Sequence, residues 1–229
     1  MDNIIKVKSL SLWIFIVPFV GINLCLLIVT QFHELVPNKV DIIHGAFPYI
    51  DGKASISRTA RVFPTYLIFK PAMFLTSYLL IKYWNYNKII FSNFNVGHKN
   101  IKYFYFFGIS SAIFLSIHSL FLGIKFDYDL YKFLRRFVMI SFIVFEIIAQ
   151  TYLVLTIYSL KDKIIKFINP IILKLKIALV ALLIIVAFIA IPIIIIDNNK
   201  YLKHAIEWNY FIGVIGFYFL TYRMWLTKK

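Results

Sequence analysis

The stretch FPYIDGKASISRTARVFPTYLIFKP, residues Phe47 to Pro71, decides the fold because it joins the longest polar loop of an apolar chain to an apolar helix. Pro48 before Asp51-Gly52 is a turn signature. Ser55 and Ser57 follow as candidate helix N-caps, since their hydroxyls accept hydrogen bonds from the first free amides of a helix. The loop is therefore expected to end in a helix start.

Arg58 and Arg61 stand three residues apart just after these serines. That spacing places both guanidinium groups on one face of a first helical turn. A guanidinium pair of this kind suits a phosphate or a carboxylate, because each planar fork donates two parallel hydrogen bonds.

The composition places the chain in the membrane class. Of its 229 residues, 61% are hydrophobic and 15% are charged, too little polar surface for a soluble globule. The formal charge of +15 comes from Lys and Arg at the ends of apolar runs and in loops, which indicates topology and anionic lipid rather than nucleic acid. The single cysteine, Cys25, excludes an internal disulfide.

The apolar runs predict an all-α polytopic membrane protein, a six-helix bundle in one domain over residues 1–229. Each run is about long enough to cross ~30 Å of hydrocarbon. The first is too long for a cleaved signal peptide and is interpreted as a retained helix. The expected spans cover about residues 11–31, 63–83, 103–124, 133–159, 177–196 and 205–225, with a long first loop over 32–62.

Six spans would put both termini on one side of the membrane. Lys and Arg are more numerous in the segments on that side, so both termini are predicted to be cytosolic. The long first loop would then face outward or into a lumen.

Ionisable residues inside spans are costly and are functional candidates by default. At 1.5 Å per residue, Lys70 and His118 lie roughly 10 Å below the outer interface and Glu146 roughly 20 Å below it. Arg135-Arg136 and Glu207 fall at the outer rim. Apart from Glu146, these groups are therefore expected beneath the long loop.

Each of these residues also has a structural interpretation. Lys70 is too deep to snorkel comfortably, which favours a buried, partnered role. A hydrogen bond to a neighbouring helix is favoured for His118, and Glu146 with Gln150 forms an i,i+4 pair expected to bond between helices. Arg135-Arg136 are equally well interface anchors, and Glu207-Trp208 is by local rules a capping acid and an interface aromatic.

No metal and no cofactor is predicted. His33, Glu34, Asp41 and His44 have ligand chemistry, but their spacing matches no known metal site. Metalloprotease, nucleophile-elbow and phosphate-loop motifs do not occur in the sequence.

Five short pieces occur together in one order: Pro48-Tyr49-Ile50, Gly52 with Ser55, Arg61, Lys82-Tyr83-Trp84 and Glu207-Trp208. In this order the chain resembles the Frag/DRAM/Sfk family of six-span membrane proteins, which includes an autophagy modulator and a post-GPI-attachment lipid-remodelling factor. One departure is that Asp51 directly follows Ile50, where DRAM-like members have a serine between them. The resemblance implies an endomembrane protein of the ER, Golgi or lysosome, linked to lipid handling, GPI-anchor remodelling or autophagy.

The first functional hypothesis is lipid handling without catalysis. An outer-facing vestibule would hold the phosphate-bearing headgroup of a membrane lipid or lipid-anchored protein, because cations at one membrane level strengthen each phosphate contact. Its residues are Arg58, Arg61, Lys70, Arg135 and Arg136. The sequence carries no signal for an oligomeric state.

The alternative is a membrane-embedded hydrolase or acyltransferase acting on lipids. His44 or His118 would be the base, Ser57 or Ser55 the nucleophile and Asp51 the orienting acid. A channel or transporter is disfavoured, since the spans offer no ring of acids and little inverted symmetry.

Overall fold

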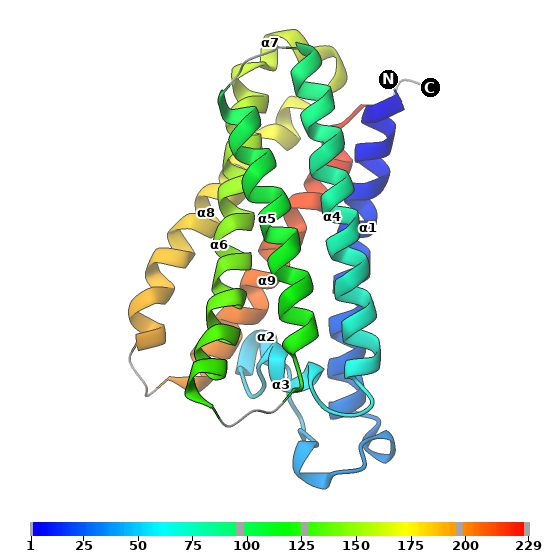
Figure 1. The fold of residues 1–229 in the computed structure, drawn as a ribbon, viewed down its shortest axis with the longest axis vertical. Coiled ribbons are helices and arrows are strands. Elements are labelled where there is room, and N and C mark those ends of the chain that lie inside the picture. The colour runs from blue at the N-terminus through cyan, green and yellow to red at the C-terminus, as the bar shows by residue number, and fades with distance from the viewer. Residues whose placement is uncertain (1, 95–98, 125–127, 196–198, 227–229) are drawn as a thin grey trace.

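The computed structural model describes residues 2–94, 99–124, 128–195 and 199–226. This part of the chain forms helices and loops, with an antiparallel bridge between Ile168 and Trp225. Its long helices, of 23 to 31 residues, run along one bundle (Figure 1) and confirm the all-α class. They are α1 (Asp2–Thr30), α4 (Tyr66–Phe94), α5 (Lys99–Phe121), α6 (Asp129–Ser159), α8 (Pro170–Ile195) and α9 (Lys200–Met224).

Four of these helices are long and apolar enough to cross a membrane: α1, α5, α6 and the Pro170–Ala190 part of α8. The sequence is therefore that of a membrane protein. Helices α4 and α9 are not among these four, and the six-span count stays a prediction.

The helices extend beyond the predicted spans because backbone hydrogen bonding continues past the apolar run. Helix α1 begins at Asp2 rather than near residue 11, and α4 ends at Phe94 rather than near residue 83. The predicted end of the fifth span, at Ile196, lies outside the described residues.

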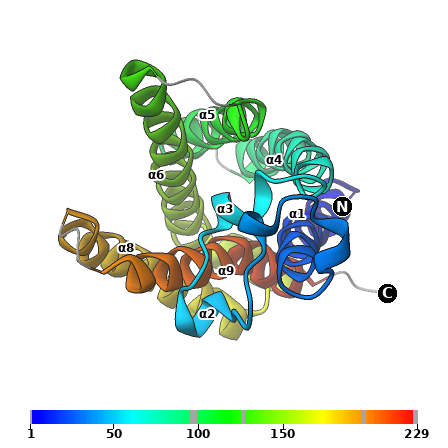
Figure 2. The same ribbon diagram turned by 90° about the horizontal axis from the view of Figure 1, so that it is seen from below.

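Seen from below, α6, α5, α4, α1, α9 and α8 follow one another around the bundle (Figure 2), and neighbours in this order pack together. Helix α1 begins and α9 ends at one end, beside α7 (Lys161–Ile164) and the 3₁₀ helix Ile165–Phe167. The opposite end carries the long loop, with 3₁₀ helices His33–Leu35 and Lys39–Asp41 followed by α2 (Pro48–Asp51) and α3 (Ile56–Ala60). We call this opposite end the loop end.

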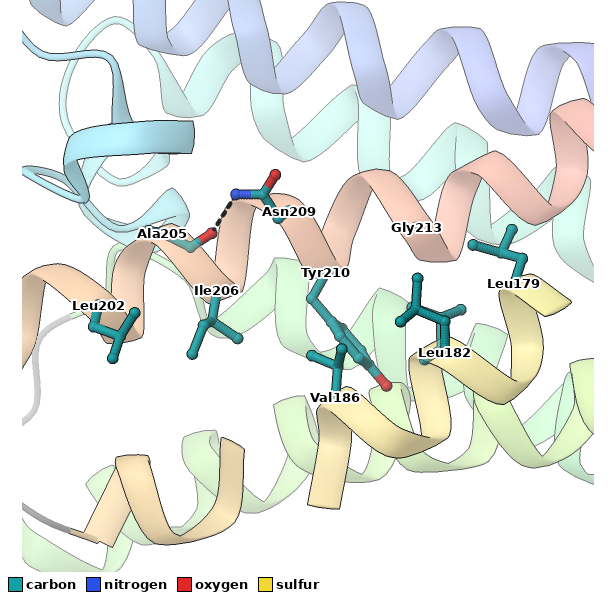
Figure 3. Close-up of a pocket in the computed structure, with 10 residues that line it drawn as sticks. Leu179, Leu182, Val186, Leu202, Ala205, Ile206, Asn209, Tyr210 and Gly213 are labelled. Carbon is teal, nitrogen blue, oxygen red and sulfur yellow. Dashed lines mark hydrogen bonds between the residues drawn. The ribbon is translucent and has the colours of Figure 1, made fainter. Parts of the chain in front are cut away.

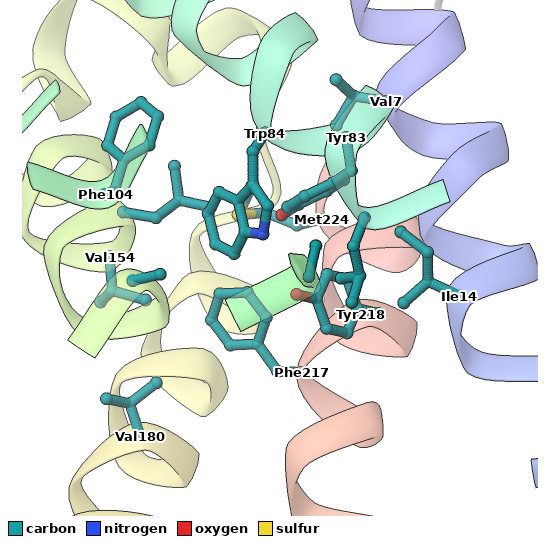
Figure 4. Close-up of a cluster of buried hydrophobic side chains, with 14 of the residues drawn as sticks. Val7, Ile14, Tyr83, Trp84, Phe104, Val154, Val180, Phe217, Tyr218 and Met224 are labelled. Atoms are coloured by element: carbon teal, nitrogen blue, oxygen red, sulfur yellow. The ribbon is translucent and has the colours of Figure 1, made fainter. Parts of the chain in front are cut away.

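Large aromatic side chains fill part of the interior of the bundle (Figure 4). Tyr83 and Trp84 of α4 meet Phe217 and Tyr218 of α9, and the rings of Tyr83 and Tyr218 lie 5.0 Å apart, edge to face. Gly108 of α5 is needed here, because a Cβ at this position would lie 2.3 Å from the Trp84 indole. The close packing fixes α4, α5 and α9 relative to one another.

Candidate functional site

The long loop is fastened to α9 by three hydrogen bonds to its backbone carbonyls. Trp208 Nε1 donates to the Ala54 carbonyl at 2.8 Å, and Asn209 Nδ2 donates to the Tyr49 carbonyl at 2.7 Å. His204 Nδ1 lies 2.8 Å from the Gly52 carbonyl. These contacts join residues more than 150 positions apart, so the predicted Pro48–Gly52 motif and the start of α9 form one unit.

Within this unit Asp51 holds the turn. Its carboxylate accepts hydrogen bonds from the backbone amides of Phe47 at 2.8 Å and Lys53 at 2.9 Å. Burial is the largest single effect and raises the pKa of Asp51, but the two amides and the Lys53 charge together lower it more, so its pKa lies below the ordinary value. Ile50 is exposed, whereas Pro48 is buried. Asp51 therefore shapes the turn in this structure.

Helix α3 is capped from two sides. Ser55 is its N-cap, and its hydroxyl accepts from the Arg58 amide at 3.2 Å. The Glu207 carboxylate of α9 faces the amides of Ile56 and Ser57, the first free amides of α3. Glu207 is thus a capping acid, as expected, but it caps α3 rather than its own helix.

Three of the residues predicted to supply cations lie near the last turns of α5. Lys70 Nζ donates to the Leu120 carbonyl at 3.4 Å. A Cβ on Gly123, just past the end of α5, would lie 3.5 Å from the Arg61 carbonyl oxygen, so the end of α3 adjoins the end of α5. Arg135 of α6 lies close enough for its charge to act on the His118 ring.

The other two cations lie on flanking elements. Arg58 is partly buried on α3, and Arg136 is exposed on α6. Within the described parts of the chain, no carboxylate lies within 4.0 Å of any of the five predicted cations; the ion pair found there joins Lys53 to Asp51. These cations are therefore not neutralised by acids of the described chain.

His118 adds an unsatisfied polar atom to this region. Its Nδ1 is buried and has no hydrogen-bond partner among the described residues, although a bond to a neighbouring helix is the expected arrangement. A buried imidazole nitrogen without a partner costs free energy unless a ligand or water supplies one.

The serines and histidines of the hydrolase alternative do not hydrogen-bond to one another in the described residues. His44 is exposed and packs edge-on against His33, with ring centroids 4.8 Å apart. The Ser57 hydroxyl lies 3.3 Å from that of Ser55, and no hydrogen bond joins either serine to a histidine in the described residues. The described residues also contain no group of three or more metal-ligating side chains.

A second polar cluster lies inside the bundle, around Glu146 of α6. Ser111 of α5 donates to Glu146 Oε2 at 2.6 Å, and Gln150 donates to Oε1 at 3.0 Å. The Tyr218 hydroxyl of α9 also donates to Oε1. Gln150 also donates a hydrogen bond to the Val214 carbonyl of α9. The predicted Glu146–Gln150 pair is confirmed, and it links α5, α6 and α9.

Lys176 of α8 is fully buried beside this cluster, and sequence reasoning missed it. Its Nζ donates to Thr221 Oγ1 at 2.7 Å and lies 3.9 Å from the centre of the Phe217 ring. The Tyr83 hydroxyl lies 3.5 Å from the same Thr221 oxygen. The predicted fifth span begins at residue 177, just after Lys176, but α8 begins six residues before Lys176, at Pro170.

Replacing Lys176 by methionine should stabilise the protein by about 1–3 kcal/mol. A buried amine without a carboxylate partner is costly, and an apolar side chain of similar length fills the same space. Thermal unfolding in detergent, followed by size-exclusion chromatography, measures the change. Lys174→Met is the matched control, because Lys174 is exposed on the same helix. A lower midpoint for Lys176→Met alone would show that its contacts outweigh the cost of burial.

Comparison with known proteins gives no match: no family model, no curated protein and no solved structure is similar to this chain. The resemblance to the Frag/DRAM/Sfk family therefore stays a prediction.

Proposed function

We propose that the protein is a six-span membrane protein whose loop end binds the phosphate-bearing headgroup of a lipid or lipid-anchored partner. The observation that carries this proposal is that the Lys70 ammonium group, the backbone of Arg61 and the charge of Arg135 all lie near the last turns of α5, with no carboxylate within salt-bridge distance in the described residues. Cations near a low-dielectric region gain most from an anionic ligand.

The chemistry of the site suits phosphate rather than a single carboxylate. Arg58, Arg61, Arg135 and Arg136 each offer a planar fork of donors, and Lys70 adds a point charge. Phosphate has enough acceptor oxygens to bond several of these groups at once. The unpartnered Nδ1 of His118 supports the proposal, because an anionic oxygen is a partner for a protonated ring nitrogen.

In the cell, this binding would serve lipid handling, remodelling of a lipid or GPI anchor, or autophagy. Both termini would lie in the cytosol, and in a eukaryote the protein would belong to an endomembrane. Catalysis by the protein itself is not favoured, since no serine–histidine hydrogen bond supports a nucleophile among the described residues.

The double charge reversal Arg58→Glu with Arg61→Glu tests the proposal. A charge-assisted hydrogen bond contributes about 1.5–3 kcal/mol, so losing both arginines should lower the amount of co-purified phospholipid by more than roughly tenfold. Mass spectrometry of the lipids bound to the purified protein provides the measurement.

The matched control is Lys161→Glu with Lys163→Glu, which reverses two exposed charges on α7 at the opposite end of the bundle. It should leave the co-purified phospholipid unchanged. Equal phospholipid content in both double variants, each eluting as folded protein, would rule out the loop-end headgroup site.

A further inference from the structure

Helices α8 and α9 enclose a groove between them (Figure 3). They pack tightly at Gly213, where a Cβ would lie 2.7 Å from Leu183 Cδ2. From there the groove, of about 320 Å³, extends toward the start of α9. Side chains that line it include Leu182, Val186, Leu202, Ile206 and Tyr210.

The α8 side of the groove lies in the most apolar span of the chain. An 18-residue window within residues 170–190 of α8 has a mean hydropathy of 2.8, and only 22% of that window is buried inside the protein. In a bilayer this helix faces hydrocarbon, so the groove opens to lipid tails rather than to water. An apolar chain is the occupant that such a groove fits.

Tyr210 adds a hydrogen-bond donor to the otherwise apolar groove, so the groove can select a ligand that carries an acceptor. Its hydroxyl is buried, has no hydrogen-bond partner among the described residues and points from α9 toward α8 (Figure 3). A helix that packed here would offer few acceptors, because its carbonyls bond within the helix. An ester carbonyl at the head of an acyl chain is an acceptor attached to hydrocarbon.

The mouth of the groove lies at the loop end. Asn209 lines the groove and donates to the carbonyl of Tyr49 in α2, so this side of the groove adjoins the long loop. Tyr210 lies deeper in the groove, between this mouth and the contact at Gly213.

We infer that the groove binds an acyl chain of an ester-linked glycerophospholipid, with the Tyr210 hydroxyl donating to the ester carbonyl. This inference rests on the proposed headgroup function and deepens it, because it names the ligand as an acylated glycerolipid.

Photo-crosslinking tests the inference. The purified protein, in nanodiscs, is exposed to a phosphatidic acid that carries a diazirine in one acyl chain, and labelled peptides are mapped by mass spectrometry. Labels should concentrate on α8 and α9. Ala205→Phe fills the groove and should lower this labelling by roughly tenfold, whereas Ala178→Phe, at an exposed position of α8 outside the lining, should leave it unchanged.

Tyr210→Phe removes the hydroxyl and keeps the ring. Loss of one hydrogen bond should lower labelling by the ester-linked probe roughly fivefold and leave labelling by an ether-linked analogue, which lacks the carbonyl, unchanged. This variant tests the inference even if Ala205→Phe fails to fold. Equal loss for both probes, or labels spread over all apolar helices, would overturn the inference, as would crosslinks between two copies of the protein.

A diacylglycerol probe separates this inference from the headgroup proposal. If diacylglycerol labels the groove as well as phosphatidic acid does, and the Arg58/Arg61 reversal has no effect, the groove stands and the headgroup site fails. If the reversal abolishes phosphatidic acid binding while Ala205→Phe and Tyr210→Phe change nothing, the headgroup site stands and the groove fails.

Discussion

Replacing Gly52 by alanine should release the long loop from α9. Gly52 has a φ of +58°, in the left-handed region that favours glycine. A Cβ there would also lie 1.7 Å from the carbonyl oxygen of Tyr201, a backbone atom that cannot rotate away. The loop must therefore move, and the contacts of Gly52 with His204 and of Ala54 with Trp208 would be lost together.

Hydrogen–deuterium exchange over residues 47–60 measures this release. Gly45→Ala is the matched control, since Gly45 has a φ of +55° but nothing within 4 Å of an added Cβ. Both variants carry the left-handed strain, about 1–2 kcal/mol, and only Gly52→Ala carries the collision. Exchange should rise strongly in Gly52→Ala and stay nearly native over 47–60 in Gly45→Ala. Equal exchange in the two variants would contradict the docked geometry.

This loop shows how far the sequence predicts the structure. Turn chemistry identifies Pro48 to Gly52, and capping rules identify Ser55, because both depend on neighbouring residues. The partner on α9 cannot be found that way. Trp208 follows the local pattern of an interface aromatic, and that interpretation is wrong: its ring is fully buried and bonded to Ala54. The contact depends on how the chain folds back over more than 150 residues.

Contacts between helices in the interior of the bundle could not be predicted from the sequence either. The i,i+4 spacing predicts that Glu146 and Gln150 share a face, but it gives no register against the other helices, so Ser111 and Tyr218 could not be identified as partners. Lys176 was missed for a different reason. Helix α8 is aliphatic on nearly every side, so its sequence has no polar stripe to show which face turns inward.

Replacing Glu146 by leucine should destabilise the protein by about 2–4 kcal/mol, because buried donors lose their acceptor. The three side chains that donate hydrogen bonds to Glu146 would not be affected equally. Ser111 can turn its hydroxyl to the Gly108 carbonyl, 2.9 Å away, and Gln150 keeps its bond to Val214. The hydroxyl of Tyr218 has no other acceptor among its hydrogen bonds in the described residues. Most of the lost stability should therefore come from the Tyr218 hydroxyl, which is left buried without an acceptor.

A double-mutant cycle in detergent, read by thermal unfolding, isolates this cost. Tyr218→Phe alone should lose about 1 kcal/mol, and adding it to Glu146→Leu should cost little more, since the stranded hydroxyl is gone. The coupling free energy should then be at least about 1 kcal/mol. Glu146→Gln is the control: its amide oxygen still accepts from Tyr218, and its amide nitrogen can donate to Ser111, so its loss should be the smallest of the single variants at position 146. Additive losses in the double variant would mean that Tyr218 and Glu146 do not share the bond.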